Sequence, residues 1–246
     1  MPNAIAYLIL GIWPVVSYVL FRRMGLERAI IWSILGGYLL LPPVAQFDLP
    51  LLPPLDKEVL PNIVVLVILV LVLKKPVRLL PRNRLATLFL FTFVLGAVGT
   101  ALTNGDAVVF HRLGSAEPIV FYVDQLPGMG LREFISLLSK QLFILIPFLV
   151  ARAWLASEVG LRELLLALVI GGLIYALPAL LEIRISPQLN IWVYGFFQHD
   201  FRQMMRGGGY RPIVFLQHAL WAAFFFATAA LSAAALARTQ VGEQRL

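Results

Sequence analysis

The sequence predicts an all-α membrane protein: about seven transmembrane helices, with the N-terminus outside and the C-terminus in the cytoplasm. Of its 246 residues, 60% are hydrophobic and 13% are charged, and the mean hydropathy is +0.87. Soluble domains are closer to half apolar and a quarter charged. A soluble fold of this length cannot bury so much apolar side chain, so its solvent must be lipid.

Seven apolar runs follow one another within a single membrane domain, residues 1–246. Their expected bounds are 4–21, 29–46, 59–73, 86–103, 134–155, 164–181 and 213–236. The third run is dense in valine and leucine, like a buried strand, but it has no partner strand pattern and an open sheet edge cannot lie in lipid. We therefore expect a short helix there, extended by Lys74 and Lys75, which can snorkel. In the loop 104–130, residues 119–123 are expected to be extended or re-entrant.

Loop charge predicts the orientation of the bundle. One set of loops and the C-terminal tail carry 12 cations: Arg22, Arg23, Arg28, Lys74, Lys75, Arg78, Arg82, Arg84, Arg152, Arg162, Arg238 and Arg245. The alternate loops carry 6: Lys57, Arg112, Arg184, Arg202, Arg206 and Arg211. The positive-inside rule places the richer set in the cytoplasm. The loop 182–212 is then on the outer face, where its four arginines are disfavoured by insertion and require another cause, for which we suggest anion binding.

Composition also excludes several kinds of site. The chain has no cysteine, so it forms no disulfide, iron–sulfur cluster or thiolate zinc site. The net charge of +7 comes mostly from residues at the ends of apolar runs, which favours a lipid surface over nucleic acid. The outer acids show no metal-ligand spacing, and the chain has no P-loop, Rossmann glycine pattern or serine nucleophile elbow. We expect neither a metal nor a cofactor.

The stretch 182–221 is the longest polar interruption of the apolar sequence. Read as a short helix, residues 192–206 place His199, Arg202 and Arg206 on one face, with aromatic and methionine side chains mostly on the other. This pattern is typical of a helix lying in the membrane interface. Binding of lipid headgroups by this cationic stripe is the alternative to a substrate-binding role.

The end of this stretch predicts a turn followed by the last span. Residues 207–209 are three glycines that allow a sharp turn, and Pro212 is suited to the first helical position. Arg211 then lies just outside a helix start that favours anions. His218, seven residues later, would lie on the same face about two turns deeper.

His218 is a candidate general base, proton relay or hydrogen-bond donor, and Gln217 can share its role. The alternatives are that Arg211 only anchors the span among headgroups and that His218 only satisfies a carbonyl of another helix.

The run RGGGYRPIVFLQHALWAAFFF, residues 206–226, resembles the O-antigen ligase and polysaccharide polymerase superfamily of bacterial inner membranes, and exopolysaccharide-type members in particular. The resemblance implies a multi-pass glycosyltransferase that moves a glycan from undecaprenyl diphosphate to an acceptor saccharide or glycolipid on the periplasmic face, without a metal. It implies catalytic roles for Arg206, Arg211 and His218. The expected substrate-binding residues around them are Arg184, His199, Arg202 and Gln217.

Family members usually have ten or more spans, so we expect this chain to be the N-terminal part of a longer bundle; a natural short cytoplasmic tail is the alternative. Other membrane proteins of polysaccharide assembly are possible partners. Two other functions stay open from sequence: a transporter or flippase-like component of the same pathway, and a non-catalytic membrane component of polysaccharide export.

Overall fold

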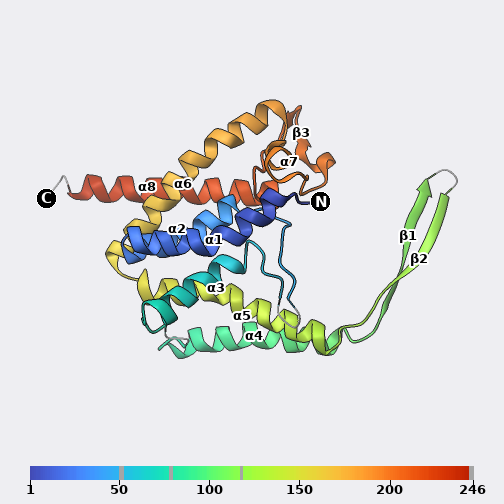
Figure 1. Ribbon diagram of the computed structural model, residues 1–246, viewed down its shortest axis with the longest axis horizontal. Coiled ribbons are helices and arrows are strands. Elements are labelled where there is room, and N and C mark those ends of the chain that lie inside the picture. Colours follow the sequence, from blue (N-terminus) through green and yellow to red (C-terminus); the bar gives the residue numbers. More distant parts are fainter. Residues whose placement is uncertain (50–52, 78–79, 117–118, 244–246) are drawn as a thin grey trace. The chain divides into compact units, whose positions relative to one another are not determined.

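The computed structural model describes residues 1–49, 53–77, 80–116 and 119–243. It divides into two compact units, one formed by Met1–Phe47, Pro54–Arg78 and Ile146–Leu246 and the other by Asp48–Pro53 and Leu79–Leu145 (Figure 1). The division falls within helix α5 (Leu131–Trp154).

The first unit is a helical bundle in which α6 packs against both α2 and α8, and α2 packs against α1 and α3 (Figure 1). Side chains outside the helices fix where some of them begin, because they accept otherwise unpaired N–H groups. Asn3 caps α1 and Ser157 caps α6. Its elements, besides the end of α5, are α1 (Ala4–Arg23), α2 (Leu26–Leu40), α3 (Leu60–Val67), a π-helical turn η1 (Ile68–Val72), α6 (Glu158–Ile185), α7 (Leu189–Tyr194), a 3-10 turn η2 (Phe201–Met204), β3 (Met205–Arg206), β4 (Gly209–Tyr210) and α8 (Ala219–Glu243).

The second unit contains α4 (Arg84–Thr103), the strands β1 (Val108–Ala116) and β2 (Ile119–Leu126), and the first part of α5. The two strands pair antiparallel, with a register shift between Leu113 and Ser115. The extended conformation expected at 119–123 is confirmed. The all-α prediction missed the hairpin, because β1 includes polar residues and an irregularity that weaken the alternation a strand should show.

Five helices in the described ranges, α1, α4, α5, α6 and α8, are long and apolar enough to cross a membrane. The run predicted at 59–73 is helical, as expected, with α3 and η1 together covering Leu60–Val72. This run and the 15-residue α2 are shorter than the roughly 20 residues that span a bilayer. The fold is therefore that of a largely helical membrane protein.

Contacts within the first unit sort its helix ends into two groups. At one end, the backbone N–H of Asn3 donates to Tyr194 at 2.9 Å, and the Tyr194 hydroxyl donates to the carbonyl of Leu40. The starts of α1 and α3 and the end of α2 therefore meet the segments that join α6 to α8, since Lys57, just before α3, also contacts Phe215.

The opposite helix ends form their own contacts. Arg28, near the start of α2, pairs with Glu163, near the start of α6, at 2.6 Å. The Lys75 amine lies 4.7 Å from the ring centre of Trp154, at the end of α5. The start of α2 therefore lies beside the start of α6, and Lys75 lies beside the end of α5.

Several predicted helix boundaries differ from the structure. Helix α2 ends at Leu40 rather than 46, because Pro42 and Pro43 disfavour helical backbone before them. Helix α6 continues to Ile185 instead of ending at 181. Helix α8 begins at Ala219 and not at 213, which leaves an irregular segment in front of it.

Candidate functional site

The segment 211–218 is non-helical, so the prediction that Pro212 starts the last span is wrong. Two of its backbone N–H groups are taken by a carboxyl group of α6, while the N–H of Leu216 donates to the carbonyl of Ile213 at 3.0 Å. Glu182, 1% exposed, accepts hydrogen bonds from Ile213 at 2.8 Å and Val214 at 2.7 Å. It also accepts one from Leu189 at 3.1 Å. These bonds divert the backbone from a helical turn.

Other polar side chains hold the rest of the segment. The Tyr175 hydroxyl, also on α6, accepts from the N–H of Phe215 at 2.9 Å. The Lys57 amine, 3% exposed, donates to the Phe215 carbonyl at 2.6 Å. The Gln198 amide donates to the carbonyls of Val214 and Leu216 at 2.9 and 3.0 Å. Irregular backbone at membrane depth needs such internal partners, because lipid offers none.

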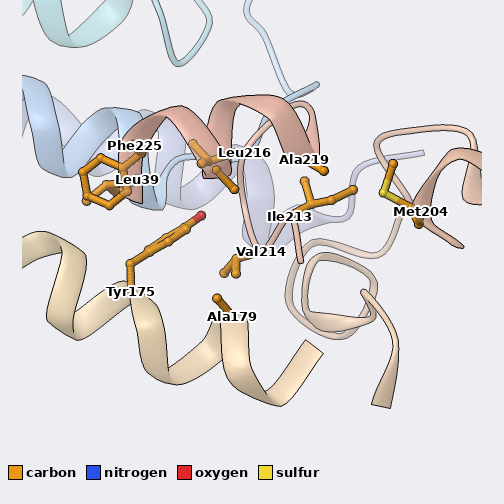
Figure 2. Packing of buried hydrophobic residues seen from close by; sticks show 10 residues of the cluster. Leu39, Tyr175, Ala179, Met204, Ile213, Val214, Leu216, Ala219 and Phe225 are labelled. Carbon is orange, nitrogen blue, oxygen red and sulfur yellow. The ribbon is translucent and has the colours of Figure 1, made fainter. Parts of the chain in front are cut away.

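Apolar side chains of the same segment form part of the core. Ile213, Val214 and Leu216 are almost completely buried, and they pack with Tyr175 and Ala179 of α6. Figure 2 shows the Tyr175 ring directed from α6 toward this segment and toward α8. Both hydrogen bonds and close packing against α6 therefore fix the segment.

Val214 has a φ of +56°, which places a β-branched residue in the left-handed region. A branched side chain at positive φ is a conformational outlier. Such strain costs about 1 to 3 kcal/mol and persists where the surroundings determine the backbone conformation. The strained residue lies between Arg211 and His218, so the strain is stored between two of the predicted site residues.

The imidazole rings of His199 and His218 lie together, with ring centres 4.3 Å apart. The sequence placed these two residues in one site, but the helical geometry expected for them is wrong. His218 precedes α8, and its Nδ1 accepts a hydrogen bond from the N–H of Leu220 at 2.9 Å. His218 is therefore a cap of α8 rather than a residue two turns inside it.

Backbone contacts also determine which ring nitrogens carry a proton. A backbone N–H can only donate, so Nδ1 of His218 is an acceptor and its proton is on Nε2 in the neutral ring. The same holds for His199, because the N–H of Asp200 lies 2.7 Å from its Nδ1; this contact is closer than the 3.3 Å to the Asp200 carbonyl. Both neutral rings consequently offer Nε2–H donors.

The electrostatic surroundings of His218 favour its uncharged form. Partial burial lowers the pKa of His218, and the nearby His199 and Arg211 lower it further because a second positive charge is disfavoured. The site at neutral pH therefore contains a guanidinium and two N–H donors. These are groups that bind oxyanions.

The predicted helix at 192–206 is wrong. Helix α7 ends at Tyr194, η2 covers Phe201–Met204, and Arg206 lies in β3, paired with Gly209 of β4. The sharp turn predicted at the three glycines is confirmed, since Gly207 and Gly208 have φ of +59° and +78°. A hairpin replaces the helix because backbone groups at 198–206 bond locally, such as the Arg202 N–H to Asp200.

The four arginines of the stretch differ in their surroundings. Arg211 is half-buried, whereas Arg184, Arg202 and Arg206 are exposed. None of the four guanidinium groups forms an ion pair or hydrogen bond with the described residues. The structure brings Arg211, His199 and His218 together, while Arg206 lies on the hairpin that leads to Arg211.

Two predicted residues are not tied to this cluster. Arg184 is at the end of α6, and Gln217 is half-buried beside His218. No contact of either side chain with the histidine pair is recorded in the described ranges.

The sequence analysis missed four residues that shape the site, namely Lys57, Tyr175, Glu182 and Gln198. Two of these four residues could have been recognised from the sequence. Glu182 is an acid directly after a predicted span, and Lys57 is a lone cation between Asp56 and Glu58. Nothing in the sequence distinguishes Tyr175 or Gln198 from other polar residues near span ends.

No protein-family model, curated protein or solved structure matches the chain. Among the described residues, no three His, Asp or Glu side chains are grouped so that they could hold a metal ion. The function is therefore argued from the site itself.

Proposed function

We propose that the protein is a membrane glycosyltransferase of the O-antigen ligase type in a bacterial inner membrane. It would transfer a glycan from an undecaprenyl-diphosphate carrier to an acceptor saccharide on the periplasmic face. The observation that carries the proposal is the cluster of Arg211, His199 and His218, which offers a guanidinium and two N–H donors. This cluster has no carboxylate partner among the described residues, so its binding capacity is free for an anion.

The arrangement of the helix ends supports an outer location for this cluster. Its segment lies at the end of the first unit where α1 starts and α2 ends. The opposite end carries Arg22, Arg23 and Arg28, as expected for a cytoplasmic side. The proposal takes α2 and α3–η1 as further spans beside the five long apolar helices, with the N-terminus outside and the C-terminus inside.

In the proposed reaction, the bond between the sugar anomeric carbon and the diphosphate oxygen breaks. A bond forms between that carbon and the acceptor hydroxyl oxygen, whose proton passes to the departing diphosphate or to water. Negative charge develops on the diphosphate, so fixed donors aimed at it lower the barrier. Arg211 and Arg206 supply positive charge, with Arg202 as a further exposed cation.

The histidine geometry favours one of the two roles open to His218. A general base needs an unprotonated nitrogen facing the substrate. In His218 the unprotonated Nδ1 is occupied by the N–H of Leu220. We therefore assign His218 to hydrogen bonding of the diphosphate through Nε2–H, with His199 beside it.

The test uses the full chain in lipid nanodiscs with an undecaprenyl-diphosphate oligosaccharide as donor. We expect transfer to an acceptor saccharide and release of undecaprenyl diphosphate. Arg211→Ala and His218→Ala should each lower transfer by at least about a hundredfold, as for loss of one transition-state donor. The matched control is Arg23→Ala, an exposed arginine at the opposite end of α1.

Unchanged transfer in Arg211→Ala would refute the site assignment. Movement of the labelled lipid-linked sugar across the bilayer without any new glycosidic bond would instead indicate transport. Full activity of an Arg206→Ala, Arg211→Ala and His218→Ala triple variant in the host would indicate a non-catalytic membrane component.

A further inference from the structure

Two buried polar side chains, Lys57 and Glu182, and the half-buried Gln198 converge on four consecutive residues. Glu182, near the end of α6, holds the N–H groups of Ile213 and Val214. Lys57, in front of α3, holds the carbonyl of Phe215, and Gln198, after α7, holds the carbonyls of Val214 and Leu216. We call the three residues Lys57, Glu182 and Gln198 the polar clamp.

Stability alone is a poor explanation for this clamp. Burying an amine and a carboxyl group near apolar surroundings costs several kcal/mol unless each gains good partners, and apolar replacements are often as stable. Here the partners are backbone groups of a segment with a strained Val214. A helix starting at Pro212 would pair the carbonyl of Phe215 within the helix and would not need the buried Lys57 amine. The N–H groups of Ile213 and Val214 would lie in its first turn and would still need an acceptor.

The consequence of the clamp is the placement of the residues on either side of it. Arg211 precedes the held segment, and His218 follows it as the cap of α8. If residues 213–218 were helical, the His218 ring would be carried into α8 and away from His199. The irregular path instead leaves the two rings 4.3 Å apart.

We propose that Lys57, Glu182 and Gln198 are positioning residues that hold Arg211 and His218 in the geometry required to bind a diphosphate. This inference rests on the proposed function for its ligand, but the geometry it claims can be measured without one. None of the three contacts substrate in this assignment. Each acts through the backbone of the segment from Ile213 to Leu216.

The first experiment reads the geometry directly. The chain has three histidines, so their ring signals can be followed by NMR in isotope-labelled protein. The pKa of His218 is lowered by burial and by His199 and Arg211. In Lys57→Met and Glu182→Gln, we expect the pKa of His218 to rise toward its ordinary value, because the ring moves away from His199 and Arg211. The His111 signal should stay constant.

The matched controls are Lys140→Met and Glu158→Gln, which change exposed side chains of the same types. A general loss of folding would broaden all three histidine signals together. If the His218 titration is the same in Lys57→Met, Glu182→Gln and the wild type, the positioning proposal is wrong.

The second experiment measures binding of farnesyl diphosphate to the same nanodisc samples. We expect Lys57→Met and Glu182→Gln to raise the Kd about tenfold or more, because small misplacements of binding groups are costly. Adding Val214→Gly to Glu182→Gln should recover part of the loss, since glycine accepts positive φ without strain. A purely structural role for Glu182 predicts the opposite, because Val214→Gly also leaves a cavity.

The two proposals fail in different ways. If His218 shifts in the clamp variants but the wild type does not bind farnesyl diphosphate, the positioning claim holds for the residues and the proposed function is wrong. If the wild type binds the probe and the clamp variants bind equally tightly, the proposed function is retained and the clamp has no positioning role.

Discussion

The Lys57 amine is buried within the first unit, and burial lowers its pKa to about 7 from 10.5. Asp56 and Glu58 oppose this effect by favouring the charged form, and the Tyr38 ring lies 5.9 Å from the amine. The unfolded chain therefore binds more protons than the folded chain between about pH 7 and pH 10.5. At neutral pH the side chain titrates between an ammonium and a neutral amine, and both forms can donate to Phe215.

A stability difference with pH follows from this shift. Because the unfolded state holds the extra proton, the free energy of unfolding gains a contribution that rises as the pH increases from about 7 toward 10.5. The Lys57→Met variant lacks this contribution. The free energy of unfolding of the wild type minus that of the variant should therefore increase across this pH window and stay constant below it. Thermal melting of both proteins from pH 6 to about 10 checks this, with Lys140→Met as control. If the stabilities of the wild type and Lys57→Met change in parallel with pH, the predicted contribution of Lys57 is contradicted.

The three consecutive glycines allow a matched comparison of backbone strain. Gly207 and Gly208 have positive φ and Gly209 does not, while a Cβ on any of them would meet open space. Gly208→Ala should weaken the β3–β4 turn by about 1 to 2 kcal/mol through the left-handed penalty alone. Amide exchange at Gly209 and Tyr210 measures this, and Gly209→Ala should leave it nearly unchanged. Equal effects of the two substitutions would mean that side-chain crowding, not backbone strain, decides the turn.

At the level of elements, the sequence predicted the apolar helices well and the site backbone poorly. Runs of apolar residues mark helices because lipid requires internal hydrogen bonding wherever the chain crosses it. The predicted ends at 103 and 155 agree closely with the helix ends at Thr103 and Trp154. The prediction of a helix start failed at Pro212, where the local sequence pattern is overridden by the carboxyl group of Glu182, 31 residues before Ile213.

The same reasoning explains which site residues were found. Arginines and histidines in an apolar chain are conspicuous, so His199, Arg211 and His218 were grouped correctly although their helical spacing was not. Lys57 acts through a contact 158 residues away, which no local pattern records. The β1–β2 hairpin was missed for a related reason, since its pairing stabilises a strand that is only weakly patterned alone.

Helices α6 and α8 approach each other closely at one glycine. A Cβ on Gly172 would lie 2.7 Å from the Cβ of Ala229, whereas a Cβ on Gly11 in α1 would meet its nearest atom at 3.7 Å. Alanine gains about 1 kcal/mol of helix propensity at either site, but overpacking costs about 1 to 3 kcal/mol where there is no room. We expect Gly172→Ala to lower the melting temperature and Gly11→Ala to leave it equal or higher. A higher melting temperature in both variants would mean that α6 and α8 move apart easily to make room for the added methyl group.

At the level of the whole molecule, the direction of the chain through the membrane decides whether the proposed chemistry is possible. Contacts in the first unit separate an end with the arginine–histidine cluster from an end with Arg28 and Lys75. An undecaprenyl-diphosphate glycan is used on the periplasmic face in the proposed reaction. The proposed function therefore requires the cluster to face outward, which is also what the charge distribution predicts.

The absence of cysteine from the sequence makes this orientation directly measurable. Gly209→Cys, on the exposed turn before Arg211, should react with a membrane-impermeant maleimide in intact spheroplasts. Arg23→Cys, exposed at the opposite end of α1, should react only after the membrane is permeabilised. The reverse pattern would place the cluster in the cytoplasm, where a lipid-linked glycan awaiting periplasmic transfer is not presented, and the glycosyltransferase proposal would fail. Labelling of both positions from outside would instead show that α1 and the cluster do not belong to one alternating bundle.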